Sequence, residues 1–309
     1  MNIEEQYLSI LSDLLSDKAI RQSNRTGVDV FKIPPRMIQH DMSDGSFPLL
    51  TTKRVAWNVM KVELEGFIQG ITSKKWFKDR ECHIWDEWCN PQKVPYSNDE
   101  ETKARMKDED DLGPCIYGAS WRNFHDPLAR VAEHDEGTYE YVHVGQNIDQ
   151  LKNIVNTLHT NPEDRRMICL AWNPLGLNHT ALPACHYSWQ VMKRGPYLDL
   201  VWTQRSVDTF LGLPFNIASY GLLLHLLAKE ANLTPGVLSG SLADLHLYEN
   251  HVDQAREQIT RMPYDLPKIV TVCDFHETEF DIFKWKHDHT IFRDFGYKCH
   301  PSIKAEVAV

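Results

Sequence analysis

Apolar residues near the N-terminus recur with the period of an α-helix. They are Ile3, Tyr7, Leu8, Leu11, Leu14 and Leu15. Spacings of three and four residues place such side chains on one face, so the pattern predicts an amphipathic first helix. From Val28 to Met42 the chain has the character of extended segments, which break at Pro34-Pro35. A second helix is predicted from Ala56 to Gly70.

The second half of the chain predicts a further helix, then consecutive strands, then a long buried helix. The first of these helices carries apolar residues from Ile148 to Leu158 and ends near Asn161-Pro162. Pro214 suits the first position of the long apolar helix, which is predicted to run to Asn232. The predicted strands are Arg166 to Trp172, His186 to Lys193, Tyr197 to Thr203, Ser239 to Tyr248 and Lys268 to Val272.

Two polar stretches interrupt this pattern, and both are predicted to be surface insertions. They cover residues 90–110 and 125–144. The first contains two acidic runs, which favour a solvated segment. No internal repeat or low-complexity tract is visible. The pattern as a whole predicts an α/β (α+β) fold, a single large domain over residues 1–309 in which helices pack on a mixed β-sheet.

Composition narrows the possible partners. The 309 residues carry a formal net charge of −10, which argues against sequence-independent binding to nucleic acid but leaves room for a small anionic substrate. The N-terminus lacks a signal-peptide pattern, and polar residues interrupt the longest apolar stretch, Leu211 to Ala228. We therefore expect a cytoplasmic protein with no membrane segment. The seven cysteines are widely spaced and odd in number, as is typical of reduced thiols.

Cys185 is a candidate nucleophile. A single cysteine between two strands is usually a small buried hydrophobic residue, and that alternative stays open. However, His186 follows it directly, and Arg205 lies at the end of the next predicted strand, where a hairpin could bring its guanidinium close. A cation beside a thiol lowers the thiol pKa and so raises the fraction of reactive thiolate.

Several arginines stand near turns or strand ends. They are Arg25, Arg165, Arg166 and Arg205. Each alone could be an ordinary surface charge. If they converge, their guanidinium groups would suit a phosphate dianion, which they bind in bidentate geometry.

Asn216 is a polar residue in a very apolar context, two residues after Pro214. It could simply satisfy backbone groups at the start of the helix. Alternatively, its side-chain amide offers an acceptor beside two donors, which matches the N3–H and O4 edge of uracil. A carboxylate would suit cytosine better. For metals, Cys82, His83 and Cys89 match no usual zinc spacing, and we expect no metal site.

These residues belong to a larger set of motifs that spans nearly the whole chain. The motifs are Asn24–Gly27, Phe47–Arg54, Ile84–Trp88, Asp111–Pro114, Asp164–Arg166, Ala171–Pro174, Cys185-His186, Gln204–Ser206, Leu211–Tyr220, His246–Tyr248 and Val307–Val309. In this order they resemble the thymidylate synthase family, and the run LGLPFNIASY at 211–220 is especially specific. The two predicted insertions lie where that family tolerates them.

The resemblance implies a mechanism. Cys185 would add to C6 of dUMP and make C5 nucleophilic toward the methylene group of 5,10-methylenetetrahydrofolate, a co-substrate. Glu63 would organise the water that handles protons, and Tyr117 would assist removal of the C5 proton. The implied catalytic set is Cys185, His186, Glu63, Tyr117 and Asn216.

The resemblance also implies a homodimer and two binding sites. The nucleotide would contact Arg25, Gln204, Arg205, Ser206, Asp208, Asn216, His246 and Tyr248, with Arg165 and Arg166 donated by the other subunit. The reduced folate would contact Ile84, Trp85, Trp88, Asp208, Leu211, Gly212, Phe215 and Ala308. Closure of the C-terminal tail would expel bulk water from the site.

Departures from the synthase pattern bear on the product. Ala184, Thr203 and Gly66 stand where the family usually has proline, an aromatic residue and tryptophan. Glu65 and Leu245 are more similar to the phage pyrimidine hydroxymethylases. Since Asn216 is expected to recognise uracil, whereas the cytidylate enzymes carry Asp there, these features together favour a dUMP hydroxymethylase of a bacterial virus, acting in the host cytoplasm.

Two alternatives remain. One is an ordinary thymidylate synthase, which reduces the transferred carbon with hydride and releases dihydrofolate; in a hydroxymethylase, water attacks the same carbon. The other is a catalytically inactive relative that binds folate or RNA. Intact Cys185, Asn216, Arg205 and Glu63 disfavour the inactive relative, and the net charge of −10 disfavours RNA binding.

Overall fold

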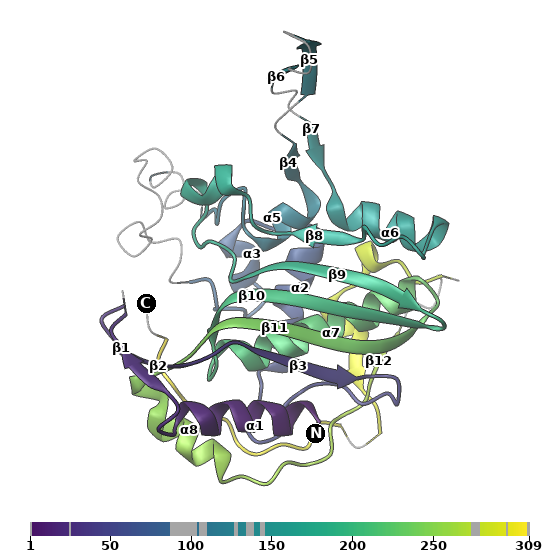
Figure 1. The fold of residues 1–309 in the computed structure, drawn as a ribbon. Helices are drawn as coiled ribbons and strands as arrows, with labels where there is room; N and C mark the ends of the chain where they lie inside the picture. Colours follow the sequence, from purple (N-terminus) through teal and green to yellow (C-terminus); the bar gives the residue numbers. More distant parts are fainter. Residues whose placement is uncertain are drawn as a thin grey trace.

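A mixed β-sheet forms the centre of the molecule (Figure 1). The computed structural model describes residues 2–24, 26–86, 104, 110–126, 129–133, 139–142, 146–272, 279–294 and 296–307. Within these, the sheet has seven strands in the order β1-β2-β11-β10-β9-β8, and β3 also pairs with β11. The strands are β1 (Ile20–Gln22), β2 (Val30–Ile33), β3 (Arg36–Asp41), β8 (Ile168–Leu170), β9 (His186–Arg194), β10 (Tyr197–Asp208) and β11 (Thr234–Tyr248). β10 and β11 are parallel and the other pairs are antiparallel.

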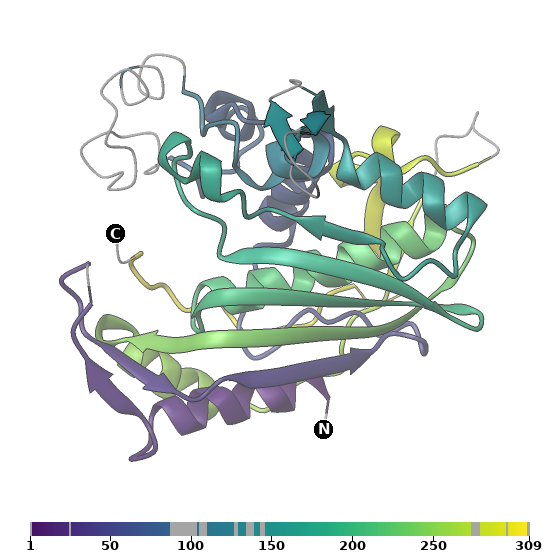
Figure 2. The same ribbon diagram turned by 45° about the horizontal axis from the view of Figure 1, so that its top comes forward.

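Helices cover one broad face of this sheet (Figures 1 and 2). The longest, α7, packs on β10 and β11, and α2 packs on both α7 and α5. α1 lies beside β2 and β3 and also contacts α8. The helices are α1 (Ile3–Leu14), α2 (Trp57–Gln69), α3 (Lys74–Lys78), α5 (Tyr117–Arg122), α6 (Gln150–Thr160), α7 (Gly212–Glu230) and α8 (Val252–Ile259).

Smaller elements complete the described part of the chain. Three two-stranded ladders are β4 (Phe124–Asp126) with β7 (Gln146–Ile148), β5 (Ala129–Glu133) with β6 (Tyr139–Val142), and β12 (Ile269–Thr271) with β13 (Thr290–Phe292). Four 3-10 turns are η1 (Pro174–His179), η2 (Glu249–His251), η3 (Ile282–Lys284) and η4 (His287–His289).

The helix-covered face of the sheet is a row of large buried side chains. The row runs across five strands through Cys169, Trp189, Trp202, Gly240 and Ile38. Trp202 stacks on Tyr220 of α7, with ring centroids 5.2 Å apart. A Cβ atom on residue 240 would lie 2.5 Å from the Trp202 ring, so only glycine leaves room for this packing.

The opposite face is more open. Side chains alternate along a strand, so the neighbours of the buried row point away from the helices. They are Leu170, Ser188, Thr203, Ser241 and Met37. Leu170 is 40% exposed and Met37 63%. No helix of the described residues lies over this face in Figures 1 and 2.

The sequence predicted most of this framework. The helices at α1, α2 and α6, the strands at β8 and β9, and the break at Pro34-Pro35 between β2 and β3 are confirmed. The single α/β domain with a mixed sheet is confirmed as well. α3, α5 and α8 were not predicted, because they are short or lie between segments that dominate the hydrophobic pattern.

Two boundaries were predicted wrongly. α7 begins at Gly212, so Pro214 is its third residue and not its first. Proline fits there because the first-turn N–H groups of a helix have no intrahelical acceptor. β10 runs on to Asp208, so Gln204, Arg205 and Ser206 lie inside a strand, next to a register shift against β9.

The structure also bears on the expected insertions, thiols, membrane segments and metal sites. Of the predicted insertion at 90–110, only residues 104 and 110 are described, and residues 125–144 include β5 and β6, so both insertions stay predictions. Cys82, Cys115, Cys169, Cys185 and Cys299 are free thiols. Among the described residues, no helix is long and apolar enough to cross a membrane. The same residues contain no group of three or more His, Cys, Asp and Glu side chains arranged to hold a metal.

Candidate active site

Cys185 lies at the start of β9, beside the bulged part of β10. The backbone N–H of Arg205 donates to the Cys185 carbonyl at 2.8 Å, which fixes the two strands together at this point. The Arg205 Nη2 lies 4.0 Å from the Cys185 Sγ. A permanently charged guanidinium therefore lies beside the sulfur. The hairpin therefore brings together the cation and the sulfur, as the sequence predicted.

The Arg205 side chain is held in place by its other contacts. Its Nε donates to the Ala184 carbonyl at 2.9 Å, and its Nη2 donates to the Pro183 carbonyl at 2.8 Å. The guanidinium also lies 5.1 Å from the ring centroid of Trp172, within the range of a cation–π contact. Trp172 was not a predicted site residue, although it belongs to one of the motifs.

His186 points into the core and not toward a solvent-filled site. Its ring stacks on Tyr117 at 4.1 Å, and its Nδ1 is 2.8 Å from the Tyr220 hydroxyl. Burial lowers the His186 pKa to about 3, so the imidazole is neutral at physiological pH. The cation near Cys185 is therefore Arg205, while His186 orients the aromatic groups around the thiol.

Tyr117 contacts Cys185 directly. The Cys185 backbone N–H donates to the Tyr117 hydroxyl oxygen at 2.8 Å. Burial raises the pKa of Tyr117 well above its usual range, and the nearby charge of Cys185 raises it further. The Tyr117 hydroxyl is thus a neutral group that accepts from the Cys185 backbone and can still donate one hydrogen bond.

Glu63 is a buried carboxyl group on α2, only 9% exposed. Burial raises its pKa from 4.5 to about 7, and the nearby Trp85 indole N–H opposes part of this shift. The Trp85 Nε1 is itself buried without a well-formed hydrogen bond among the described residues. A carboxyl with a pKa near 7 can both take and give a proton at neutral pH, as a general acid–base group must.

Aromatic rings separate this end of the molecule from water. Phe67 stacks on Tyr117 at 5.0 Å, and the Trp85 ring lies 6.1 Å from the Tyr117 ring. All three residues are at least 97% buried: Phe67 is 2% exposed, and Trp85 and Tyr117 are each 3% exposed. Glu63 and Cys185 therefore have apolar rings as neighbours. Surroundings of low polarity strengthen any electrostatic interaction formed there.

Asn216 lies in the second turn of α7 and is fixed by Gln204. The Gln204 Nε2 donates to the Asn216 Oδ1 at 3.0 Å, and the Gln204 Oε1 accepts from the Trp202 indole at 3.3 Å. The bond settles which end of the Asn216 amide carries the oxygen. Its N–H groups have no partner among the described residues, so the amide is free to donate to a ligand.

The start of α7 is tied to the end of β10 by Asp208. Its Oδ1 accepts from the backbone N–H groups of Phe210 at 3.1 Å and Leu211 at 3.0 Å. A Cβ on Gly212 would lie 3.5 Å from the Asp208 Cβ and 3.8 Å from the Asn216 Oδ1. Because His246 pairs with Asp208 across β10 and β11, the predicted sugar-binding residues lie on the adjacent strand.

The similarity of the whole chain to known proteins can now be stated. The model of the thymidylate synthase family matches residues 5–309. The chain belongs to the thymidylate synthase family. It is therefore a one-carbon transferase, from a family that transfers the methylene group of methylenetetrahydrofolate to C5 of dUMP.

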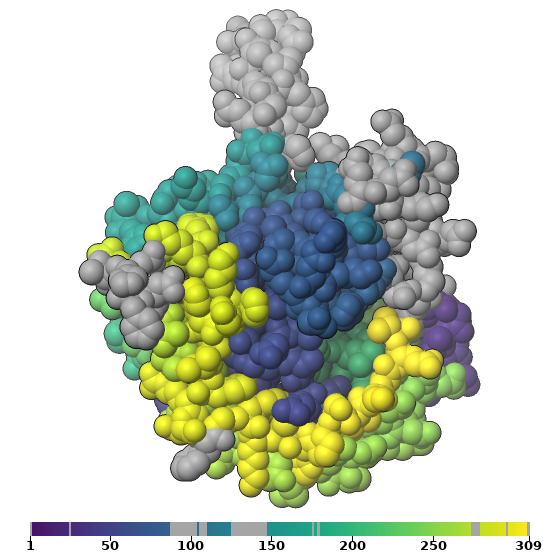
Figure 3. Space-filling view, turned by 180° about the vertical axis from the view of Figure 1, so that it is seen from behind, coloured from purple at the N-terminus to yellow at the C-terminus, as the bar shows by residue number. Residues whose placement is uncertain are grey.

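The residues present suit the two molecules that this family uses. Asn216 and Arg205 offer donors for a pyrimidine edge and an anionic group, and Ser206 lies beside Arg205 on the same strand. Trp85 places its buried indole beside the Glu63 carboxyl and near the Phe67 and Tyr117 rings. Figure 3 shows a hollow in the surface between the C-terminal segment and residues coloured blue.

The C-terminal segment is docked on the body of the protein. The His251 Nε2 lies 2.7 Å from the Glu306 carbonyl oxygen. This contact keeps the end of the chain beside η2 and α8. Of the other predicted folate contacts, Ile84 is 37% exposed, and Leu211 and Phe215 are half-buried at the start of α7.

Two predicted phosphate ligands lie far from Cys185 in the same chain. Arg165 and Arg166 precede β8, where Val191 bonds to Met167 and the Arg166 guanidinium pairs with Asp164 at 2.7 Å. Arg166 therefore lies beside the far end of β9, about 23 Å from Cys185 at the usual rise of a strand. Within one subunit these arginines do not reach the thiol. Arg25, Trp88 and Ala308 lie outside the described residues.

Three of the hydroxymethylase-like positions do not line the site. Thr203 points to the open face of the sheet, opposite to Gln204. The Glu65 carboxylate is buried against η4, where it accepts from the His287 backbone N–H at 2.9 Å. Leu245 is fully buried in the core of the sheet. Only Ala184, beside Cys185, and Gly66, on the helix of Glu63, remain close to the chemistry.

Gly66 is explained by packing. A Cβ on residue 66 would lie 2.4 Å from the Phe77 ring and 3.2 Å from the Trp76 ring. α3 thus fills the space above α2 with two aromatic rings supplied from another element. Although glycine replaces the tryptophan that is usual in the family at this position, aromatic side chains from α3 still lie near Glu63.

Proposed function

We propose that this protein converts dUMP to thymidylate, with 5,10-methylenetetrahydrofolate as the source of the one-carbon unit and the hydride. The supporting observation is the pairing of a guanidinium-activated thiol with a uracil-matching amide. Cys185 Sγ lies 4.0 Å from Arg205, and Gln204 orients Asn216 at 3.0 Å. Each of these contacts is fixed by backbone bonds in β9, β10 and α7.

The chemistry begins at Cys185. Its thiolate adds to C6 of the uracil ring, which turns C5 into the nucleophile that takes the one-carbon unit. Tyr117 and Glu63 then handle the proton that leaves C5: the Tyr117 hydroxyl is bonded to the Cys185 backbone N–H, and the Glu63 carboxyl has a pKa near 7. Loss of that proton expels tetrahydrofolate and leaves a methylene group on C5. Hydride from tetrahydrofolate then reduces this carbon to the methyl group, which gives dihydrofolate, breaks the Sγ–C6 bond and returns the free thiolate.

Binding of the nucleotide uses side chains of β10 and β11 and, in this proposal, a second subunit. Arg205, Ser206 and Arg25 hold the 5′-phosphate, and His246 and Tyr248 hold the sugar. Arg165 and Arg166 reach the site of a partner subunit, since they lie far from Cys185 in their own chain. The open sheet face, with exposed Leu170 and Met37, is the surface on which we place that dimer contact.

The choice of hydride over water rests on the aromatic wall. Phe67, Trp85 and Tyr117 are each no more than 3% exposed and pack on one another, with Trp85 beside Glu63 and Tyr117 bonded to the Cys185 backbone. A site that excludes water protects a reactive carbon from hydrolysis. The docked C-terminal segment acts in the same direction.

A second candidate product is 5-hydroxymethyl-dUMP, as in the hydroxymethylases of bacterial viruses. It is favoured by Ala184, which is smaller than the proline usual in the family, and by Gly66, which removes a tryptophan from α2. Both changes lie near the reacting groups. Phe77 and Trp76 fill the space at Gly66, which leaves Ala184 as the main support for access of water.

Product analysis separates the two reactions. The purified protein is incubated with dUMP and methylenetetrahydrofolate in ¹⁸O-labelled water, and nucleotides and folates are identified by mass spectrometry. We expect thymidylate and dihydrofolate in equal amounts, without heavy oxygen in the nucleotide. A hydroxymethyl nucleotide that carries the heavy oxygen, formed without dihydrofolate, would establish the second candidate instead.

A further inference from the structure

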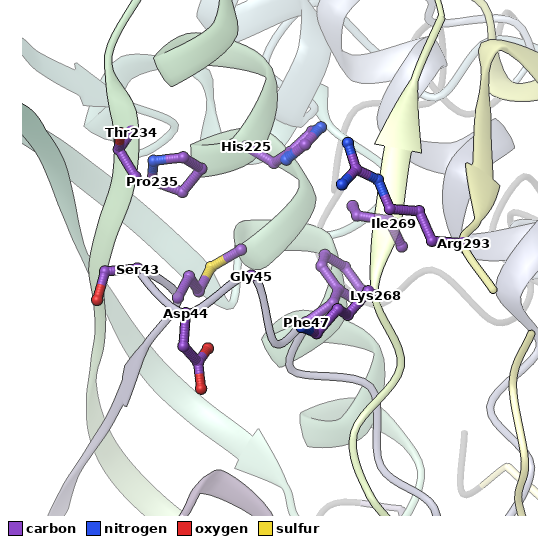
Figure 4. A pocket seen from close by; sticks show the side chains of 11 residues that line it. Ser43, Asp44, Gly45, Phe47, His225, Thr234, Pro235, Lys268, Ile269 and Arg293 are labelled. Atoms are coloured by element: carbon purple, nitrogen blue, oxygen red, sulfur yellow. The ribbon is translucent and has the colours of Figure 1, made fainter. Parts of the chain in front are cut away.

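A second pocket lies at the opposite end of α7 from Asn216. It has a volume of about 350 Å³ and opens between the turn after β3, the start of β11 and the β12–β13 ladder. The side chains that matter are Asp44, His225, Lys268 and Arg293 (Figure 4). His225 is nine residues after Asn216 in the same helix, about 13 Å along its axis. The pocket is thus separate from the site around Cys185.

Lys268 and Arg293, two cationic residues that line this pocket, are paired through their backbones. The Arg293 N–H donates to the Lys268 carbonyl at 2.8 Å, and the residues continue the antiparallel register of Ile269 with Phe292. Neither side chain has an ion pair among the described residues. Both cationic side chains thus line the same pocket without an internal counter-ion pair in the described part of the chain.

His225 adds an unsatisfied polar atom behind these cations. Its Nε2 is buried and has no hydrogen-bond partner among the described residues. Burial, together with the charges of Lys229 and Arg293, lowers the His225 pKa to about 4. Figure 4 shows the ring beside the Arg293 guanidinium. An orphaned buried polar group costs about 1–3 kcal/mol, which a bound ligand or reorganisation could recover.

Asp44, the carboxylate at this pocket, is already occupied. It accepts from the Ser46 backbone N–H at 2.8 Å, and this turn is the main reason why the pKa of Asp44 is lowered. Lys268 contributes only a smaller part of that shift. Positive charge therefore predominates around the opening, even with Asp44 ionised.

We propose that this pocket binds the dianion of a small phosphate monoester. The Arg293 guanidinium suits two phosphate oxygens, and Lys268 supplies the second positive charge. Phe47 and Ile269 give the pocket an apolar lining for the organic part of the ligand. The volume is at the lower end for ligand pockets, which fits a compact molecule. Succinate also carries two negative charges, but on two separate carboxylates, so it does not offer these residues the oxygens of one compact dianionic group.

The test observes His225 directly in the full-length protein. The histidine rings are labelled with ¹³C and followed by NMR while inorganic phosphate, glycerol 3-phosphate or succinate is added at constant ionic strength. The His225 signal is identified by its absence in His225→Gln. We expect a saturable shift of this signal with both phosphates, with glycerol 3-phosphate at least as tight as inorganic phosphate, and no saturable shift with succinate.

A pair of matched double variants completes the experiment. Lys268→Gln with Arg293→Gln should weaken phosphate binding at His225 at least about tenfold, the effect of 1.4 kcal/mol. Lys152→Gln with Arg256→Gln removes the same charge from α6 and α8 and should leave binding unchanged. The proposal is overturned if phosphate gives no saturable shift, if both double variants behave alike, if succinate binds as phosphate does, or if glycerol 3-phosphate binds more weakly than inorganic phosphate.

Discussion

An arginine and a histidine lie near each end of α7, and the two pairs differ in whether their polar atoms have partners within the protein. At the Asn216 end, Arg205 donates to two carbonyl groups, and His186 bonds to the Tyr220 hydroxyl. At the other end, Arg293 has no ion pair among the described residues, and the His225 Nε2 has no hydrogen bond there. Both histidines are neutral for the same reason, because burial lowers their pKa to about 3 and about 4.

The difference shows how a protein prepares a reacting group and how it leaves room for a ligand. Around Cys185 the protein itself supplies the partners, so the geometry is fixed before substrate binds. Such preorganisation avoids the cost of reorientation during the reaction. At the distal pocket the charges have no internal partners, and a ligand would have to supply them.

Replacing the Cys185 thiol should cause the largest loss of activity. Cys185→Ala removes the nucleophile while keeping Arg205 bonded to the carbonyls of Pro183 and Ala184. We expect turnover to fall by at least about 10⁴-fold, the scale seen when a nucleophile is removed, with dUMP binding largely retained. Single-turnover kinetics and calorimetric titration measure the two effects. More than trace turnover by this variant would rule out the covalent mechanism.

Removing the Glu63 carboxyl should give the next largest loss of activity. Glu63→Gln keeps the shape but cannot take a proton, and general acid–base groups typically contribute about 10²- to 10⁴-fold. The wild-type rate should fall as the pH drops below about 7, where the carboxylate becomes protonated. The pH profile of kcat/KM measures this limb. A variant that keeps the same limb would show that another group titrates.

The same substitution should act on stability in the opposite direction. Burial raises the folded-state pKa of Glu63 from 4.5 to about 7. The carboxyl therefore stays protonated to a higher pH in the folded protein than in the unfolded chain. Its contribution to stability is therefore lost as the pH rises from about 4.5 to 7, by an amount on the order of 3 kcal/mol. Glu63→Gln should remove this decline. Urea unfolding at pH 5 and pH 8 compares the two proteins.

Changing Asn216 should alter the choice of base. Asn216→Asp replaces two N–H donors with an acceptor, which suits the amino group of cytosine. Loss of a matched buried hydrogen bond costs about 1–3 kcal/mol, so the preference for dUMP over dCMP should change by about ten- to a hundredfold. Competition between the two nucleotides measures this ratio. Equal use of both by the wild type would exclude Asn216 as the recognition residue.

The smallest predicted effect concerns stability at the distal pocket. Lys268→Gln removes one of the two cations that line this pocket, and we expect a gain of a few tenths of a kcal/mol in the free energy of unfolding at low salt, smaller at high salt. The exposed Lys152→Gln serves as the control and should give no gain. A loss of stability in Lys268→Gln would show that Lys268 has a stabilising partner.

Sequence patterns predicted the elements whose hydrophobic period is long and regular, such as α1, α2 and α6. They also predicted correctly that Arg205 lies close to Cys185, since two adjacent antiparallel strands must lie together. They could not predict which face of the sheet a given strand residue occupies. Thr203 was expected near the reacting carbon but faces the open side of the sheet.

Other features depend on contacts between distant residues. Glu65 was expected to mark a hydroxymethylase, yet it anchors His287, which is 222 residues away in the sequence. The space at Gly66 is filled by Phe77 from another helix. The distal pocket was not predicted either, because Asp44, His225 and Arg293 each appear ordinary in the sequence and meet only in the folded chain.

The most direct measurement of the central claim follows the hydrogen at C5 of the nucleotide. The protein is given dUMP labelled with tritium at C5, together with methylenetetrahydrofolate, and tritium in water is compared with the product formed. Addition of Cys185 to C6 and transfer to C5 predict one tritium released for each nucleotide converted, and none from Cys185→Ala. Product that keeps its tritium, or equal release by the variant, would contradict the proposed function of this site.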